Sequence, residues 1–335
     1  MMNKKVTIFS IILIVIGIVG TIYFSISSVP YFTQTISNIE KSLDKEQVIY
    51  NKNISIENLD VKTKVSNIII EKYEGHEVKV VKKGTSNYNI KEDGNKLSIV
   101  ENENEYNYKI SNNLEEFIEN VINAFYYNNS QSLIIYVPNN INVNASTDYA
   151  RLSIENNLLL DSVYYKTING YISLPKGMKT LKNLDIKSNG HIYLSTEELI
   201  GIDNVNIESG GIEIYSAQNE IFVDDIEKFI PKTINITQNS NSSSNINIDT
   251  NIPIAKELNI NAYNSSVYIN IPSKNYNFSV DMKSISGINA SNMLIDEHYR
   301  NDENLKELKG NLNKENLNNE EKYIINVKAD NINLH

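Results

Sequence analysis

The sequence contains no cysteine, no tryptophan and only two arginines, Arg151 and Arg300. Without cysteine there can be no disulfide, no thiolate nucleophile, no cysteine-ligated zinc and no lipid on an N-terminal cysteine. With so few arginines, bidentate clamps for phosphate or carboxylate groups are nearly absent. The formal net charge is −10, from 31 Lys and Arg against 41 Asp and Glu, whereas nucleic-acid-binding proteins present a basic face. We therefore expect no nucleic-acid partner and a fold held together by core packing.

Catalytic and metal-binding motifs are missing as well. The sequence has no H-E-x-x-H, P-loop, dinucleotide fingerprint or G-x-S-x-G elbow, and no EF-hand or G-G-x-G-x-D calcium repeat. Asp224 and Asp225 form the tightest acidic pair of the strand region, and such a pair fits a helix turn or a solvated surface better than a metal site. Four isolated histidines are expected on the surface, with the second on a strand exterior: His76, His191, His298 and His335. We assign no catalytic residue, cofactor or metal ligand and predict that the protein is not an enzyme.

An uncharged apolar segment lies near the N-terminus. Residues 6–29 carry no charged side chain and are long enough to cross the hydrocarbon core of a bilayer as a helix. The lysine pair just before this segment places residues 1–5 in the cytoplasm by the positive-inside rule. A cleaved signal peptide is the alternative, with Ser25 and Ser27 as small residues at the cleavage site, but the apolar run is longer than a usual signal h-region. The sequence favours a signal anchor of a single-pass cell-membrane protein whose C-terminal domain is extracellular.

A polar juxtamembrane spacer, residues 30–52, follows the apolar segment. A short stalk helix and a flexible linker both fit this stretch. From residue 53 to 335 apolar and polar residues alternate, which is typical of strands with one buried face. Ile, Val, Thr and Tyr dominate these runs, as strands prefer. We therefore expect an extracellular all-β domain over residues 53–335.

One short phrase recurs within this region. It consists of an alternating run, a polar pair ending in Gly, and a second alternating run, and it reads VYYKTINGYISL (163–174), LDIKSNGHIYL (184–194) and VNIESGGIEIY (205–215). The copies start about 21 residues apart, a spacing typical of repeat architectures.

Two architectures fit the phrase. Each copy could be a β-hairpin whose Asn-Gly or Gly-Gly pair forms a type I′ turn. Alternatively, each copy is one coil of a β-solenoid, its strands pair with those of the next coil, and Gly marks a corner with an unusual dihedral angle. A solenoid requires a constant period because equivalent residues must lie over one another, whereas a hairpin meander does not. The period favours the solenoid, with Ile186 and Ile207 stacked in one core.

These features resemble a known family. The short alternating strands, the S-x-G-x-I phrase, Val137 and Pro138 closing an early strand and the single N-terminal anchor are together similar to the bacterial "putative adhesin" family, a domain of unknown function. The resemblance covers roughly residues 53–335. It implies a single-domain, right-handed, short-strand β-helix or β-roll outside the membrane, often encoded near envelope-stress regulators in Gram-positive bacteria. It carries no catalytic signature.

Two segments interrupt the strand pattern. Residues 112–129 place Leu114, Phe117, Ile118 and Val121 on one apolar face at helical spacing, which predicts an inserted amphipathic helix. This helix could cover a solenoid end or bind a partner, and its acidic polar face argues against lipid. Residues 292–321 are dense in charge and Asn, and we expect a loop insertion that is at most partly helical.

The sequence therefore predicts a non-catalytic, membrane-anchored cell-envelope protein. Its adhesin-like ectodomain would act in surface or cell-wall interaction or in envelope-stress signalling, with the membrane, a cell-wall polymer or another envelope protein as partner. A cell-wall polysaccharide-processing enzyme on a β-helix scaffold is the alternative, and it requires two carboxylates across the scissile bond. The aligned coils place Lys187 beside Glu208 and show no acidic ladder. A third possibility is a scaffold subunit for another membrane protein.

The abundant tyrosines, 21 in number, have two explanations. They could form a binding face, because Tyr gives amphipathic contact at low entropic cost, or they could reflect the strand preference for Tyr. The candidates for such a face are Tyr126, Tyr127, Tyr164, Tyr165, Tyr193 and Tyr215.

Overall fold

The computed structural model describes most of the chain from residue 45 onward. The described ranges are 45–73, 77–102, 131–155, 158–176, 181–216, 229–239, 244–273, 276–290, 294–302, 305–312 and 322–335. Two units are distinguished, and one of them, the β-unit, comprises residues 47–82, 86–104 and 131–335. In the other unit, scattered positions between 17 and 41 are described and all are helical. There the hydroxyls of Thr21 and Thr33 donate to the carbonyl oxygens of the residues four positions earlier.

The predicted membrane segment and the predicted amphipathic helix, residues 6–29 and 112–129, lie outside the described residues apart from isolated positions in the first. Within the described part of the chain, no helix combines the length and apolar character needed to span a bilayer.

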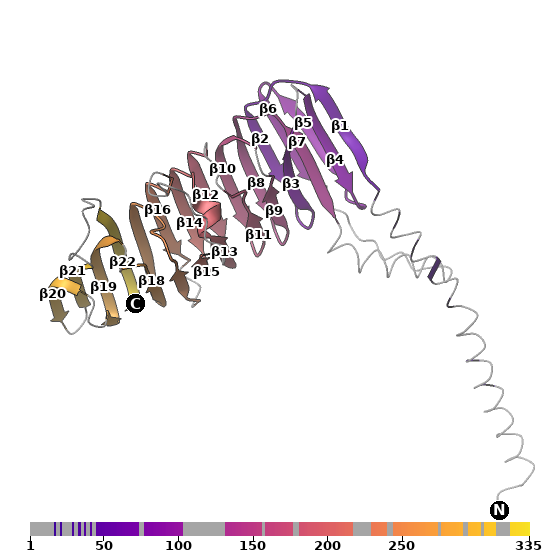
Figure 1. The fold of residues 1–335 in the computed structure, drawn as a ribbon. Helices are drawn as coiled ribbons and strands as arrows, with labels where there is room; N and C mark the ends of the chain where they lie inside the picture. The colour runs from indigo at the N-terminus through magenta and orange to yellow at the C-terminus, as the bar shows by residue number, and fades with distance from the viewer. Residues whose placement is uncertain are drawn as a thin grey trace, which may run out of the picture. The chain divides into compact units, whose positions relative to one another are not determined.

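The β-unit consists almost entirely of strands (Figure 1). Among the described residues of this unit, one helical turn occurs, α3 (Thr196–Leu199), which is capped by Ser195 in a capping box with Glu198. The strands are β1 (Gln47–Asn53), β2 (Asn58–Lys62), β3 (Asn67–Lys72), β4 (Glu77–Lys83), β5 (Tyr88–Asp93), β6 (Lys96–Glu101), β7 (Ser132–Val137), β8 (Ile141–Thr147), β9 (Arg151–Ile154), β10 (Leu160–Thr167), β11 (Tyr171–Ser173), β12 (Asn183–Ser188), β13 (His191–Ser195), β14 (Asn204–Ser209), β15 (Gly211–Tyr215), β16 (Thr233–Gln238), β17 (Ile246–Asp249), β18 (Glu257–Asn270), β19 (Asn277–Asn289), β20 (Leu294–Asp302), β21 (Leu305–Leu312) and β22 (Lys322–Leu334).

The first strands of successive repeats stack side by side in parallel and in register. This first ladder runs in the order β2, β8, β10, β12, β14, β16, β18, β22 and β19. Val163 lies opposite Leu184, and Leu184 lies opposite Val205. The structure therefore matches the sequence period, since residues 21 positions apart, such as Lys187 and Glu208, are direct neighbours.

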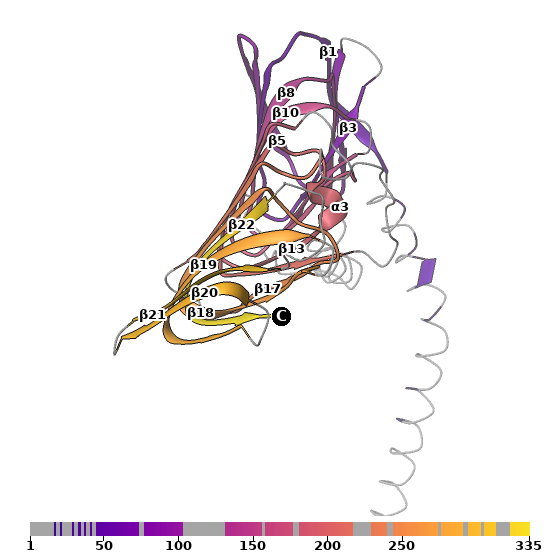
Figure 2. The ribbon, with the colours of Figure 1, turned by 60° about the vertical axis from the view of Figure 1, so that its left-hand side comes forward.

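The second strands of the repeats form a second ladder. It contains β7, β3, β9 and β11 in one run and β13, β15, β17 and the second half of β18 in another. Figure 2 shows the two walls of strands, with β8 and β10 on one wall and β3 on the other. β12 pairs with β10 and β14, whereas β13 pairs with β15. The two halves of the phrase thus belong to different ladders, so the hairpin alternative is wrong and solenoid-like stacking is confirmed. The right-handedness stays a prediction.

Both ends of the stack depart from simple repetition. β1 pairs antiparallel with β4 and β5 with β6 at one end, while β19, β21 and β20 form an antiparallel set at the other. The C-terminal strand β22 inserts between β18 and β19 (Figure 1). The last strand of the chain therefore has a partner on each side and is not an exposed edge.

Two boundary predictions need correction. The expected loop over residues 292–321 contains the strands β20 and β21, whose charged residues pair across to neighbours, as Lys283 does with Glu307 at 2.8 Å. The spacer predicted over residues 30–52 ends earlier than expected, because β1 begins at Gln47 and pairs with β4.

A column of large apolar side chains fills the space between the ladders. Tyr165, Ile186 and Ile207 follow one another in register, and each is at most 2% exposed. This confirms the predicted stacking of Ile186 on Ile207. Burial of each such side chain contributes about 1.5–3 kcal/mol of transfer free energy, so the apolar half of the alternation holds the stack together.

The corner of the repeat is closed by a buried hydroxyl. The side chains of Thr63, Thr147, Ser209 and Ser284 each donate to a carbonyl two or three residues further on, at 2.7–3.0 Å. These hydroxyls are buried between rungs and satisfy a carbonyl that the ladders leave free at the bend.

The corner glycines are required for close approach and not for an unusual dihedral angle, so that expectation is wrong. Among the described glycines, positive φ angles occur at Gly84, Gly94 and Gly201, none of which lies in the repeated phrase. A Cβ at Gly170 would instead lie 2.5 Å from the hydroxyl oxygens of Thr167 and Tyr165. These two residues belong to the same rung as Gly170, and the carbonyl oxygen of Ala150 on the preceding rung would be closer still, so no room remains for a side chain there.

Gly170→Ala is expected to destabilise the β-unit by about 1–3 kcal/mol, because the added methyl overpacks a buried corner. The matched control is Gly287→Ala at an equivalent corner, where the nearest atom to the added methyl would be 3.4 Å away. We expect that variant to change the free energy of unfolding by about 0.5 kcal/mol or less. Equilibrium denaturation of the full chain in urea measures both, and equal losses would contradict the close-approach explanation.

Candidate functional site

A row of amide side chains runs along the outer face of the first ladder. Its members are aligned by strand register on β14, β16, β18 and β22, and an aspartate occupies the same row on the flanking strands β12 and β19. We call this row the amide ladder: Asn206, Asn235, Asn259 and Asn326, with Asp185 at one end and Asp281 at the other.

The amides of the ladder are hydrogen-bonded head to tail. Each Nδ2 donates to the oxygen on the preceding rung, over 2.7 Å from Asn206 to Asp185, 2.9 Å from Asn235 to Asn206, 3.0 Å from Asn259 to Asn235 and 2.8 Å from Asn326 to Asn259. A carboxylate can only accept, so Asp185 sets the direction of the whole row. Every amide oxygen then points toward β19.

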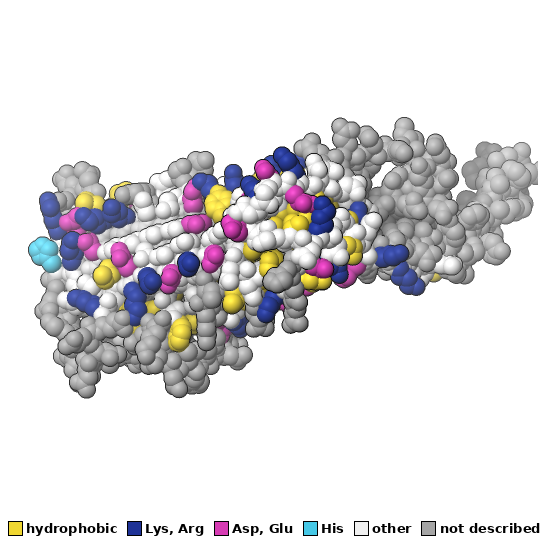
Figure 3. All heavy atoms as spheres, turned by 90° about the horizontal axis from the view of Figure 1, so that it is seen from above, with side chains coloured by type: hydrophobic (Ala, Val, Ile, Leu, Met, Phe, Trp, Pro, Cys, Tyr) yellow, Lys and Arg dark blue, Asp and Glu magenta, His cyan; other side chains and the backbone are white. Residues whose placement is uncertain are grey.

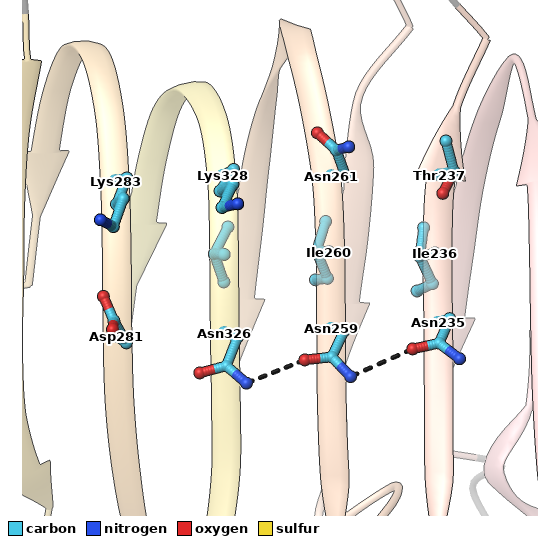
Figure 4. Close-up of a pocket in the computed structure, with 11 residues that line it drawn as sticks. Asn235, Ile236, Thr237, Asn259, Ile260, Asn261, Asp281, Lys283, Asn326 and Lys328 are labelled. Atoms are coloured by element: carbon cyan, nitrogen blue, oxygen red, sulfur yellow. Dashed lines mark hydrogen bonds between the residues drawn. The ribbon is translucent and has the colours of Figure 1, made fainter.

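A groove of about 490 Å³ lies over the C-terminal part of the amide ladder. Its lining includes a second outward row, parallel to the ladder and two residues further along each strand: Thr237, Asn261, Lys328 and Lys283 (Figure 4). Ile236, Ile260 and Val327 lie between the rows and are buried on the core side. The core thus supports a groove whose two outward rows are made of polar side chains.

The charged groups of the groove differ in how they are paired. Lys283 donates to Glu307 at 2.8 Å, and this hydrogen bond holds the pKa of Glu307 below its usual value. Asp281 accepts from Lys309 through Oδ2, while its buried Oδ1 has no partner among the described residues. Lys328 is exposed, and no described group pairs with it. The groove therefore exposes an ammonium group that no described residue pairs with.

Carboxylates are sparse among the described residues of the groove. Asp281 is the one carboxylate among the described residues that line the groove, whereas glycoside hydrolysis uses two carboxyl groups. No cluster of three or more His, Asp or Glu side chains suitable for a metal occurs in the described ranges. Further along the same face, Lys187 lies beside Glu208 at 2.6 Å, and this hydrogen bond raises the pKa of Lys187. That contact confirms the predicted position of Lys187 beside Glu208 in the aligned coils.

The tyrosines do not form one face. Tyr164 is exposed on the first ladder, Tyr193 and Tyr215 are exposed on the second, and Tyr165 is buried in the core. Tyr126 and Tyr127 lie outside the described residues.

The histidines and the acidic pair acquire no role. His191 lies on the outer side of β13, half-buried, with its ring 4.6 Å from that of Tyr193. His298 and His335 are exposed. Asp224, Asp225 and His76 lie outside the described residues.

Sequence reasoning missed the amide ladder, although a signal for it is present. Each amide lies between two buried aliphatic residues, as in Val205-Asn206-Ile207 and Leu258-Asn259-Ile260. The intervals between successive amides are irregular, at 29, 24 and 67 residues. Insertions between rungs, and the return of β22 into the stack, separate in sequence what the register aligns in space.

The comparisons with known proteins concern nearly the whole β-unit. The family model described as Toastrack DUF4097 matches residues 56–335. Solved structures that match include a "putative cell adhesion protein" from Clostridium sporogenes, 14% identical over 87% of this chain and 98% of that chain, with a TM-score of 0.19. Another is a "putative adhesin" from Bacteroides fragilis, 9% identical over 88% of this chain and 99% of that chain, with a TM-score of 0.33. No curated protein matches the sequence.

Asn259→Ala is expected to lower the free energy of unfolding by about 1–2 kcal/mol, because its amide makes hydrogen bonds to Asn235, Glu257 and Asn326. Asn261→Ala is the matched control on the same face of the same strand, and its amide has no described hydrogen-bond partner. We expect the control to change stability by about 0.5 kcal/mol or less. Denaturant titrations compare the two variants, and a control that loses as much as Asn259→Ala would show that the ladder contributes nothing.

Proposed function

This chain belongs to the Toastrack DUF4097 family, and we propose that it is a non-catalytic, membrane-anchored protein of the cell envelope whose adhesin-like β-unit binds a surface or cell-wall polymer. The family match begins at residue 56, close to the limit expected from the sequence, and the predicted family resemblance is confirmed. The family supports the adhesin-like role.

The amide ladder with its groove is the observation that carries the proposal. Neighbouring strands lie about 4.8 Å apart, so the ladder presents the same amide group once per rung over several rungs. An extended polymer also repeats its polar groups along one line. A row of this kind therefore fits a chain-like ligand laid across the rungs better than a compact small molecule, which would use one enclosed pocket.

The single groove carboxylate supports a binding role over the enzymatic alternative. A polysaccharide-processing enzyme would need a second carboxyl group facing Asp281 across the groove, and the described lining supplies lysines and amides there. Contact with another envelope protein, as in stress signalling, would also be non-catalytic.

The membrane anchor is supported by the sequence. Residues 6–29 carry no charge and follow a lysine pair, which favours a cytoplasmic N-terminus and an external β-unit.

Because the chain has no cysteine, single introduced cysteines report its topology cleanly. Tyr149→Cys lies at a corner that is 64% exposed, and we expect a membrane-impermeant maleimide to label it in intact cells. Asn3→Cys should react only after the cells are permeabilised. Labelling of Asn3→Cys in intact cells, or protection of Tyr149→Cys, would reverse the topology, and loss of residue 3 from the mature chain would indicate cleavage.

The full chain in detergent micelles is expected to sediment with purified, protein-free bacterial cell walls without releasing reducing sugar ends. Release of reducing ends by the wild type, abolished in Asp281→Asn, would establish the enzymatic alternative instead. Failure to sediment with the walls would remove the proposed polymer-binding role.

A further inference from the structure

The amide ladder lies between two carboxylates, and it can satisfy only one of them. Each amide donates in one direction and accepts in the other, so a head-to-tail row has a donor end and an acceptor end. Asp185 and Asp281, at the two ends, are both acceptors when ionised. One end of the row must therefore bring two acceptors together, whichever way the amides are oriented.

The unsatisfied end is the one at Asp281. Asp185 receives the Nδ2 of Asn206 at 2.7 Å. At the opposite end, the Nδ2 of Asn326 is directed to Asn259, so its oxygen is on the side of β19, where Asp281 is its register partner (Figure 4). Asp281 Oδ1 is buried without a partner in the described structure. The oxygen of Asn326 therefore ends the row without a hydrogen bond from any described side chain, because its register partner Asp281 cannot donate when ionised, and a ligand donor would supply that bond.

The second row of the groove offers hydrogen-bond donors, whereas the end of the amide ladder offers an acceptor. Lys328 and Asn261 are exposed there, and no described group pairs with the ammonium of the first or the amide of the second. The two rows are two residues apart along each strand, or roughly 7 Å. A ligand that spans this distance could donate a hydrogen bond to the amide ladder and accept hydrogen bonds from the second row.

Sugar hydroxyls meet this requirement because each hydroxyl both donates and accepts. The protein carries a net charge of −10, which repels a polyanion over a Debye length. Acidic and basic side chains both occur along the face shown in Figure 3.

We propose that the groove over β16, β18, β22 and β19 binds a neutral, hydroxyl-rich glycan strand. One sugar hydroxyl donates to Asn326 Oδ1, and oxygens of the same strand accept from Lys328 and Asn261. This inference rests on the proposed polymer-binding function and specifies its site and ligand class.

The test uses the full chain in detergent micelles with two neutral probes, cellohexaose and the N-acetylglucosamine hexamer, and calorimetric titration as the readout. Asp281→Asn supplies an amide donor opposite Asn326, so the ladder is completed from within the protein. We expect at least a tenfold weaker affinity for whichever neutral probe the wild type binds, without a fall in the denaturation midpoint. A merely structural role for Asp281 would lower the midpoint and leave the affinity unchanged.

Asp185→Asn is the matched control, since it makes the same exchange at the satisfied end of the ladder and outside the groove lining. We expect its affinity to stay within twofold of the wild type. Lys328→Gln removes the exposed ammonium without touching the core, and we expect a several-fold weaker affinity. That variant keeps the proposal testable should Asp281→Asn fail to fold.

Several results would overturn the proposal. These are wild-type affinity in both Asp281→Asn and Lys328→Gln, equal losses in Asp281→Asn and Asp185→Asn, or binding of polygalacturonate with no binding of either neutral probe. Sedimentation with cell walls, together with no binding of the neutral probes, would overturn this ligand assignment while leaving the proposed function in place. If the protein neither sediments with cell walls nor binds the neutral probes, both the ligand assignment and the proposed function would be overturned.

Discussion

In-register parallel pairing between successive rungs is the constraint on which the rest of the structure depends. Backbone hydrogen bonds hold neighbouring strands about 4.8 Å apart, so residues at equivalent positions become stacked neighbours. Inside, this register produces the column of Tyr165, Ile186 and Ile207. Outside, the same register aligns the amides of Asn235 and Asn259 closely enough to hydrogen-bond at 3.0 Å. One backbone arrangement therefore generates both the core and the candidate site.

The close spacing of rungs also explains what the corners tolerate. A hydroxyl at Thr147 or Ser209 can close the bend because it donates to a nearby carbonyl without adding bulk. A methyl group at Gly170 would clash with the carbonyl oxygen of Ala150 on the preceding rung and with the hydroxyls of its own rung. The Ser and Gly of the repeated phrase are thus parts of the backbone design, and the chemistry of the molecule lies on the strand faces between the corners.

The amide ladder connects the fold to its proposed use. A head-to-tail row has a direction, and that direction leaves the oxygen of Asn326 at the end of the row, beside a strand whose register partner, Asp281, cannot donate to it. The groove in which they lie contains one carboxylate, exposed amides and an exposed lysine, which suits hydrogen-bonded recognition of a polymer. The binding role proposed above rests on this row and its groove.

Local patterns in the sequence determined the strand class, the period and the facing of the core, because alternation and spacing are properties of the chain alone. The stacking of Ile186 on Ile207 and the family follow from them. The strands β20 and β21 were missed because a charged, Asn-rich segment is typical of a loop. In the structure, Glu307 and Lys309 of β21 form ion pairs with Lys283 and Asp281 of β19, and these pairs depend on the tertiary contact between the two strands. Only the tertiary structure placed β22 between β18 and β19 and aligned four amides separated by irregular intervals. The order of the rungs depends on pairing between strands that are far apart in the sequence, and no local sequence pattern encodes that order.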